Sequence, residues 1–196
     1  MTSPVQRALA VVWNDIPPAL QAHYSVNDSV HVEHGHLSVE YPSWLQWPLN
    51  IMVKFGVLVN QRELEVPTTV QREIRGDIEY WHREMVFTKK PATFTSYTLF
   101  KEAGTIVEYP NRLLGLRMKL SWSDNTLRYH SDGYVLGVFG REMRIPDWLA
   151  LGKASIEERA LADGRYEMDF RIRHPLFGEV FRYYGVFGVK VDTIKK

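Results

Sequence analysis

The most suggestive group of polar side chains lies on one predicted strand at residues 78–87, with the sequence IEYWHREMVF. Successive side chains of a strand point to opposite faces, so His82 and Glu84 share one face while Trp81 and Arg83 share the other. A histidine and a carboxylate that enter a cavity together are suited to acid–base catalysis. If this face points inward, the sequence predicts an interior acid–base pair of His82 and Glu84.

The opposite face of the same strand is the one that we expect to be buried. Trp81, Met85 and Phe87 on this face have more apolar surface area to bury than the tyrosine and the two aliphatic side chains on the other face. Arg83 is then an inward charge, and a buried charge needs a partner. We expect that partner to be Glu157 or Glu158. Because ion-pair networks also place charges in interiors, we favour a structural pair, with an acid–base role for Arg83 and Glu158 as the alternative.

A second group of chemically capable residues comprises His31, Glu33, His34 and His36. Imidazole and carboxylate groups bind zinc, but a site needs convergent geometry, and Gly35 lets the flanking histidines point apart. The chain has no cysteine, which excludes disulfides, thiolate ligands and a cysteine nucleophile. We therefore expect no metal site and no cofactor.

Other chemistries lack their signatures. The sequence contains neither a Gly-x-Ser-x-Gly nucleophile motif nor a glycine-rich phosphate loop. The nearest approach to a nucleic-acid surface is Arg171, Arg173 and Arg182 with Tyr183 and Tyr184. Alternating arginines are typical of a solvent-facing strand. A formal net charge of +1 gives the whole chain no strong electrostatic attraction to nucleic acid. We expect no nucleic-acid partner.

Residues 42–59 form the one stretch that is apolar on nearly all sides. It is shorter than the roughly 20 residues of a membrane-spanning helix and contains Pro48, so we do not expect it to cross a membrane. One interpretation is a buried helix laid across the open side of a curved sheet. The alternative is a lid or interfacial segment that touches lipid or an apolar ligand, which leaves peripheral membrane contact open.

The elements that would position these residues are mainly strands. Alternating and β-branched runs separated by turn residues extend over residues 66–191, and the clearest unit is a strand–turn–strand–turn–strand pattern at residues 154–189. Residues 1–25 carry helix signals, with Ser3 as the cap of a helix at residues 5–13 and a second helix at residues 19–23. Two short runs on either side of Gly35 predict a first hairpin.

About eight to ten antiparallel strands with helices confined to the first third predict a mainly β fold with minor α. We expect a single antiparallel sheet, strongly curved or closed into a barrel and lipocalin-like in outline, with N-terminal helices and the apolar helix at residues 42–59 covering it. A chain of 196 residues predicts one domain over residues 1–196. Its first residues lack the basic and apolar regions of a secretory signal, so we expect a cytoplasmic protein.

A curved sheet rich in aromatic residues suits a cavity for an apolar ligand. Aromatic residues make up 13% of the chain, including six Trp. The side chains expected to contact the ligand are Trp44, Trp47, Phe55, Trp81, Met118, Trp122 and Phe170. The favoured function is non-enzymatic binding of an apolar or amphipathic, lipid-like small molecule, and an enzyme with acid–base residues inside the barrel is the alternative.

Several short motifs run along the chain in a recognisable order. They are found at residues 16–20 (IPPAL), 127–129 (LRY), 144–149 (RIPDWL), 156–159 (IEER), 163–166 (DGRY), 175–178 (PLFG) and 182–185 (RYYG). Their order and spacing resemble the bacterial family called domain of unknown function 4166. That family's domain is often C-terminal to oxidoreductases similar to saccharopine dehydrogenase. Because this chain has no Gly-x-Gly-x-x-Gly fingerprint, the resemblance implies a separately encoded oxidoreductase as a partner. It carries over no catalytic residue and leaves the oligomeric state open.

Overall fold

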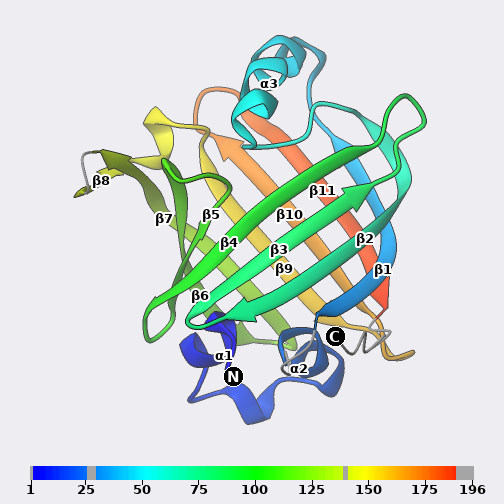
Figure 1. The fold of residues 1–196 in the computed structure, drawn as a ribbon, viewed down its shortest axis with the longest axis vertical. Helices are drawn as coiled ribbons and strands as arrows, with labels where there is room; N and C mark the ends of the chain where they lie inside the picture. Colours follow the sequence, from blue (N-terminus) through cyan, green and yellow to red (C-terminus); the bar gives the residue numbers. More distant parts are fainter. Residues whose placement is uncertain (1, 26–29, 139–140, 189–196) are drawn as a thin grey trace.

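A closed ring of ten antiparallel strands forms the body of the protein (Figure 1). The computed structural model describes residues 2–25, 30–138 and 141–188. The strands are β1 (His31–Glu40), β2 (Glu63–Arg75), β3 (Ile78–Met85), β4 (Ala92–Glu102), β5 (Thr105–Tyr109), β6 (Leu114–Ser123), β7 (Thr126–Val138), β8 (Arg141–Ile145), β9 (Lys153–Ala160), β10 (Tyr166–His174) and β11 (Gly178–Gly188). They pair in the order β6-β5-β4-β3-β2-β1-β11-β10-β9-β7, and pairing of β7 with β6 closes the ring. The prediction of a mainly β fold with a barrel is confirmed.

The C-terminal strand unit agrees with its sequence pattern. The predicted three-strand run corresponds to β9, β10 and β11, with Tyr166 paired to Ala160 on one side and to Phe187 on the other. A single 3-10 turn at Asp147–Leu149 precedes this unit, while β8 lies outside the ring and pairs with the second half of β7. The predicted strand residues 189–191 lie outside the described residues.

The predicted hairpin around Gly35 is wrong, because β1 is one continuous strand. Gly35 lies opposite Phe187 of β11, and a Cβ on it would stand 2.3 Å from the Val186 carbonyl oxygen and 2.5 Å from the Phe187 ring. The glycine is therefore needed for the close approach of β1 to β11 and not for a turn. Gly185 has the same role across this seam, since its Cβ would meet the His36 carbonyl oxygen at 2.0 Å.

Short helices close one end of the barrel, and we call this the α2 end. They are α1 (Pro4–Ala8), the 3-10 helix η1 (Trp13–Asp15) and α2 (Pro18–Tyr24). Ser3 caps α1 as predicted, with its Oγ accepting from the Gln6 amide at 3.1 Å. The helix ends earlier than predicted, because the Ala8 carbonyl accepts a hydrogen bond from the Gly104 amide in the β4–β5 turn.

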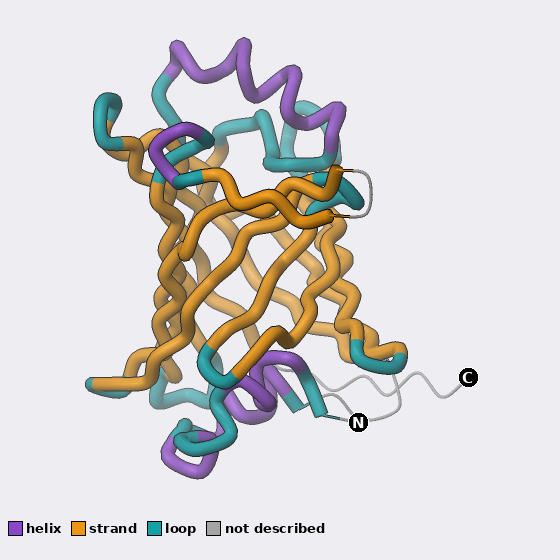
Figure 2. Tube along the Cα trace, turned by 90° about the vertical axis from the view of Figure 1, so that its left-hand side faces the viewer, coloured by secondary structure: helices purple, strands orange, loops and turns teal. Residues whose placement is uncertain are grey.

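Residues 42–59 lie over the opposite end of the barrel, which we call the α3 end (Figure 2). They form η2 (Ser43–Leu45), α3 (Gln46–Met52) and η3 (Val53–Phe55), and Gly56 ends the run with a left-handed φ of 69°. Leu49 is fully buried, whereas Trp47 is 72% exposed. The interpretation of a buried helix across an open sheet is wrong, because the sheet closes on itself and leaves no open side. No helix among the described residues is long and apolar enough to cross a membrane.

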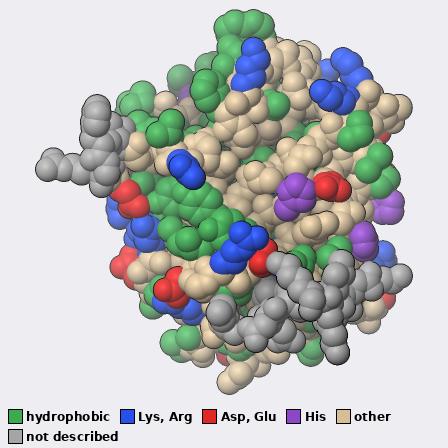
Figure 3. Space-filling view, viewed as in Figure 1, with side chains coloured by type: hydrophobic (Ala, Val, Ile, Leu, Met, Phe, Trp, Pro, Cys, Tyr) green, Lys and Arg blue, Asp and Glu red, His purple; other side chains and the backbone are tan. Residues whose placement is uncertain are grey.

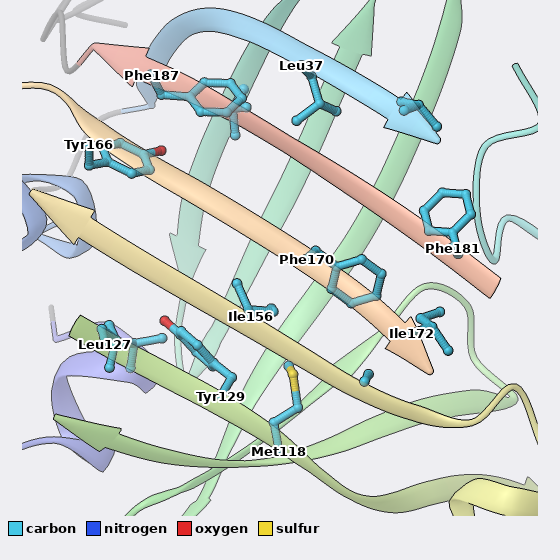
Figure 4. Packing of buried hydrophobic residues seen from close by; sticks show 14 of the residues in the cluster. Leu37, Met118, Leu127, Tyr129, Ile156, Tyr166, Phe170, Ile172, Phe181 and Phe187 are labelled. Atoms are coloured by element: carbon cyan, nitrogen blue, oxygen red, sulfur yellow. The ribbon is translucent and has the colours of Figure 1, made fainter. Parts of the chain in front are cut away.

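The main hydrophobic core fills the barrel. Figure 4 shows Leu37, Ile156, Phe170 and Phe181 projecting from four different strands toward a shared interior. Such inward projection follows from alternation along each strand, with polar neighbours on the outer face. The barrel wall thus presents an apolar interior that holds the candidate site.

Candidate functional site

Two cavities lie inside the barrel. The space for the centres of water-sized molecules is about 90 Å³ in the larger and about 70 Å³ in the smaller. The larger one is lined by Val5 and His23 at the α2 end and by Val59 at the α3 end, whereas the smaller one lies toward the α3 end beside Leu151. The side chains that line both cavities are Leu58, Phe94, Glu108 and Tyr183.

Apolar side chains from most strands form the wall of the larger cavity. They include Leu37, Val70, Met85, Ile106, Met118, Ile156, Met168, Phe181 and Phe187. Small-molecule sites in proteins are typically concave and apolar, with a few polar groups that fix the ligand's orientation. The polar groups at this wall would therefore determine how a ligand is oriented.

Arg83 brings a positive charge to this apolar space. Its Nη1 donates to Ser96 Oγ at 2.9 Å and its Nη2 donates to Glu108 Oε1 at 3.3 Å. The Ser96 hydroxyl donates to the same carboxylate oxygen at 2.6 Å. The prediction that Arg83 points inward together with Trp81 and Met85 is confirmed, because all three line the cavity.

The prediction that Glu157 or Glu158 pairs with Arg83 is wrong. β3 pairs with β4 and β4 pairs with β5, so Glu108 of β5 comes to the inner face beside Arg83. Glu157 lies on the outer face and pairs with Arg159 at 2.7 Å, while Glu158 is inside the barrel but bonded elsewhere. The partner depends on the order of strands around the ring, which sequence spacing does not reveal.

The alternative acid–base pair lies on the outer surface. His82 Nε2 is 3.0 Å from Glu84 Oε1, and the two side chains are 40% and 56% exposed. Their strand neighbours Trp81 and Met85 occupy the inner face. The alternative of an interior acid–base pair of His82 and Glu84 is therefore wrong, whereas the favoured orientation of the strand is confirmed.

Two hydrogen-bond donors at the cavity have no partner among the described residues. Trp81 Nε1 is buried and unpaired, and its ring lies between the guanidinium groups of Arg72 and Arg83, each 4.9 Å from the ring centre. The Tyr183 hydroxyl also makes no hydrogen bond, although its ring lines both cavities. Burial raises the pKa of Tyr183, which keeps the hydroxyl protonated and able to donate.

A network of buried charges lies toward the α2 end. Glu33 accepts from His23 Nδ1 at 2.8 Å and from the Tyr166 hydroxyl at 2.7 Å, and pairs with Arg72 Nη2 at 3.2 Å. Arg72 also donates to Glu79 at 3.0 Å. Burial lowers the pKa of His23 to about 4, so its ring is neutral. Burial opposes charge on Glu33, but His23 and Arg72 lower the pKa of Glu33 overall, which leaves an ionised Glu33–Arg72 pair.

Glu158 lies between this network and the larger cavity, which it helps to line. Its Oε2 accepts from the Tyr24 hydroxyl at 2.6 Å, and the Tyr129 hydroxyl donates to that of Tyr24 at 2.5 Å. Burial raises the pKa of Glu158 to about 7. A carboxyl group that titrates near neutrality is able to hold or release a proton at an apolar surface.

Some of the predicted ligand-contacting side chains reach the cavities. Trp81 and Met118 line the larger cavity and Phe170 lines the smaller one. Trp122 packs against the core without lining either cavity. The interior set is therefore smaller than the sequence indicates.

The predicted ligand-contacting residues from the apolar stretch lie on the outer surface. Trp44 is 52% exposed and Phe55 is 63% exposed, and together with Trp47 they line neither cavity. Because α3 sits over the barrel end, these rings face away from the interior. Their place is the outside of the α3 end.

Sequence reasoning missed the two most informative polar groups. The sequence pattern groups Tyr183 with arginines on a solvent-facing strand, yet Tyr183 shares its strand face with the buried Phe181 and Phe187 and lies inside. The sequence pattern groups Glu33 with the histidines, yet Glu33 shares its strand face with the buried Leu37 and Val39 of β1. Alternation was the available signal in both cases.

The histidines of β1 point to opposite faces. His31 Nε2 lies 3.4 Å from Glu33 in the buried network, whereas exposed His34 contacts Thr69 at 3.1 Å. Within residues 2–25, 30–138 and 141–188, no three acidic or imidazole groups come together in a way that could hold a metal ion. On the outer face, Asp169 pairs with both Arg171 and Arg182.

Comparison with known proteins identifies relatives by sequence family and by fold. The family model described as "Domain of unknown function (DUF4166)" matches residues 16–187. A similar solved structure is the crystal structure of Rv2717c from M. tuberculosis, with a TM-score of 0.50 and 15% sequence identity, covering 90% of this chain and 99% of that chain. At this identity the likeness concerns the fold alone. No curated protein matches the chain.

Proposed function

This chain belongs to the DUF4166 family, described as a domain of unknown function, and we propose that its barrel binds an apolar or amphipathic small molecule that carries an oxygen acceptor. The observation that carries the proposal is Trp81 Nε1, a buried donor without a partner at an apolar cavity. Tyr183 lines the same cavity, and its hydroxyl has no hydrogen-bond partner among the described residues. A buried donor without a partner costs about 1–3 kcal/mol. A ligand oxygen that accepts from these groups would remove that cost.

Arg83 supports an oxygen-bearing ligand over a pure hydrocarbon. Its guanidinium has five N–H donors, of which Ser96 and Glu108 take two. Charge-assisted hydrogen bonds are stronger than neutral ones, so a ligand carbonyl or carboxylate that accepts from Arg83 would bind more tightly. The rest of the wall, including Met118 and Ile156, suits a hydrocarbon body.

The cavity volumes define how a ligand would fit. The larger cavity, about 90 Å³, is below the roughly 300–1,000 Å³ typical of small-molecule sites. A longer ligand therefore requires the shared side chains, among them Leu58, Phe94 and Tyr183, to move so that both cavities join into one elongated site. Leu58 belongs to the segment that follows η3. Its displacement would open the site toward the α3 end, which favours entry there.

Fluorescence titration with saturated fatty acids of graded chain length tests the proposal, because Trp81 reports on the cavity. We expect saturable binding by the wild-type protein. Tyr183→Phe keeps the ring and removes the hydroxyl, so it should weaken binding about tenfold, the effect of one hydrogen bond. The matched control is Tyr97→Phe, whose ring lines neither interior cavity and whose binding should equal that of the wild type.

A cavity-filling variant gives a second readout. Met118→Phe adds volume at the wall of the larger cavity and should reduce binding while thermal melting confirms the fold. Absence of saturable binding at every chain length, together with a native mass spectrum of the bare protein as purified, would contradict the proposal.

A second candidate function rests on Glu158. Its carboxyl group, with a pKa of about 7, lies at the cavity that would hold the ligand, so it could take a proton from carbon next to a ligand carbonyl and return it. In heavy water this cycle exchanges C–H for C–D in the bound ligand without net reaction. Glu158→Gln should abolish the exchange and leave ligand affinity unchanged. Binding without any wild-type exchange would leave only the binding function.

Three expectations from the sequence remain predictions. They are the separately encoded oxidoreductase partner, the cytoplasmic location and the single-domain organisation. Co-purification from the native host tests the partner, and cell fractionation tests the location. Calorimetric unfolding tests the domain organisation, because a single domain unfolds in one cooperative transition.

A further inference from the structure

The exposed large hydrophobic side chains gather at one end of the barrel. In an antiparallel ring, alternate strand connections emerge at the same end, and here the β1–β2 connection, which contains α3, lies at the same end as four others. We call this surface the α3 rim, defined by residues 41–64, 86–91, 110–113, 142–153 and 174–177. Of the fourteen exposed large hydrophobic residues in the described part of the chain, twelve lie on the rim. Trp47 is 72% exposed, Trp148 62% and Leu176 81%.

Aromatic rings on different rim segments touch each other. Trp44, before α3, and Phe177, between β10 and β11, have ring centroids 5.3 Å apart, and Phe177 also stacks on His174 at 4.8 Å. In Figure 3, hydrophobic side chains lie over α3 at the top of the view with basic side chains beside them. At least two rim segments therefore share one apolar surface, and clustered exposed apolar side chains mark interaction sites.

The same rim carries the unpaired positive charges. Seven lysine and arginine side chains lie on it, against three acidic side chains. The seven are Lys54, Arg62, Lys89, Lys90, Arg112, Arg144 and Lys153. None has an ion-pair partner among the described residues, whereas every other Lys or Arg side chain that the structure describes has one. The whole chain has a formal charge of only +1, so the positive charge is concentrated at the rim.

We propose that the α3 rim docks onto the surface of an anionic lipid bilayer. Tryptophan and phenylalanine side chains such as Trp47 and Phe55 would enter the boundary between headgroups and acyl chains, where amphipathic and aromatic rings are favoured. Lys54, Lys89 and Lys90 would remain at the level of the lipid phosphates. Polybasic surfaces gain attraction from anionic lipids in this way.

Charge argues against a second copy of the chain as the occupant. A two-fold symmetric dimer places the same patch on both subunits, so seven unpaired cations would face seven others. The acidic residues of the rim are too few to compensate, and one of them, Glu63, already accepts from Thr88. A bilayer surface satisfies the apolar side chains and the cations together, which a copy of the same rim does not.

Docking at the rim is independent of the proposed ligand binding, but the two fit together. Leu58, which lines both cavities, lies within the rim segment 41–64. An apolar ligand leaving a bilayer would therefore meet the segment whose movement opens the interior. The docking test below uses vesicles without added ligand, so its outcome does not depend on the titration.

Vesicle co-sedimentation of the full chain tests the docking. The probes are phosphatidylcholine vesicles with and without phosphatidylserine. We expect the wild-type protein to sediment with the anionic vesicles, to sediment less with neutral ones, and to dissociate as salt is raised. The triple variant Lys54→Glu, Lys89→Glu, Lys90→Glu should bind anionic vesicles at least about 100-fold more weakly.

Matched controls lie at the other end of the barrel. Arg75→Glu with Arg165→Glu changes exposed charges there, and Val11→Ser removes a hydrophobic side chain that is 96% exposed. Both controls should sediment like the wild type, whereas Trp47→Ser with Phe55→Ser should lose binding to both kinds of vesicle. Equal sedimentation of the triple variant and the wild type would overturn the proposal. So would wild-type dimerisation that Trp47→Ser and Phe55→Ser abolish, since the rim would then be a self-association surface.

Discussion

The two ends of the barrel differ in whether their charged side chains are buried and paired. At the α2 end, Glu33, Arg72 and Glu79 are completely buried, and Arg72 lies within 3.2 Å of both carboxylates. At the α3 end, seven exposed cations have no ion-pair partner within the part of the chain that the structure describes, and they lie among twelve exposed hydrophobic residues. Breaking a buried pair is costly, whereas exposed charges contribute little to stability. We therefore expect substitutions in the buried charges of the α2 end to lower stability, whereas the exposed side chains of the α3 end are the ones that we propose for contact with other molecules.

The largest expected effect is that of Arg72→Met. This substitution leaves Glu33 and Glu79 inside the barrel without their cation, so the free energy of unfolding should fall by about 3–5 kcal/mol. Urea denaturation measures the loss. Arg165→Met is the control, because it removes an exposed pair with Asp163 and should leave unfolding nearly unchanged. Equal losses from the two substitutions would show that the buried charges of the α2 end matter no more for stability than exposed ones.

Two buried groups at the α2 end give opposite pH dependences. Folded Glu158 keeps its proton up to about pH 7, while an unfolded carboxyl loses it near 4.5, so this group lowers stability as pH rises between those values. Folded His23 has a pKa of about 4 against 6.5 unfolded, so its contribution is complete above pH 6.5 and is lost as pH falls toward 4. The two effects oppose each other in the wild type.

Glu158→Gln separates these effects. The free energy of unfolding of the variant, minus that of the wild type, should rise by on the order of 3 kcal/mol from pH 4.5 to about 7. Denaturation curves at each pH measure this difference, and Glu84→Gln on the outer face is the control. A difference that stays constant across the window would show that Glu158 is not held protonated.

The smallest expected effect is at the rim. Trp47→Ser should change the free energy of unfolding by no more than about 0.5 kcal/mol, because the side chain is 72% exposed. Leu49→Ala on the same helix should cost about 2–5 kcal/mol, since Leu49 is fully buried. Chemical denaturation of both variants measures the two free energies of unfolding. A large loss from Trp47→Ser would mean that the ring supports the fold and is not free to meet a partner.

Local pattern was enough to predict most strands, because alternation and turn residues act over a few positions. The local pattern failed where a residue contacts another that is far away in the sequence. Gly35 has the type expected of a turn, yet it admits the Phe187 ring from β11. The apolar composition of residues 42–59 predicted burial, but whether a sheet closes and excludes a helix depends on the pairing of β6 with β7.

The sequence predicted that Arg83 points into the barrel, but it did not predict which residue pairs with Arg83. Apolar neighbours correctly placed Arg83 inside the barrel. Its partner Glu108 is 25 positions away along the chain and two strands away in the ring, a relation that only strand order determines. The raised pKa of Glu158 likewise depends on burial among Tyr24 and Tyr129, which come from distant segments.

The most direct measurement is a crystal structure of the protein grown with a saturated fatty acid that binds in the titration. A carboxylate oxygen within hydrogen-bond distance of the Tyr183 hydroxyl and Trp81 Nε1, with the acyl chain along the joined cavities, is the predicted result. A fatty acid bound only on the outer surface, with Trp81 and Tyr183 unchanged inside the barrel, would contradict it.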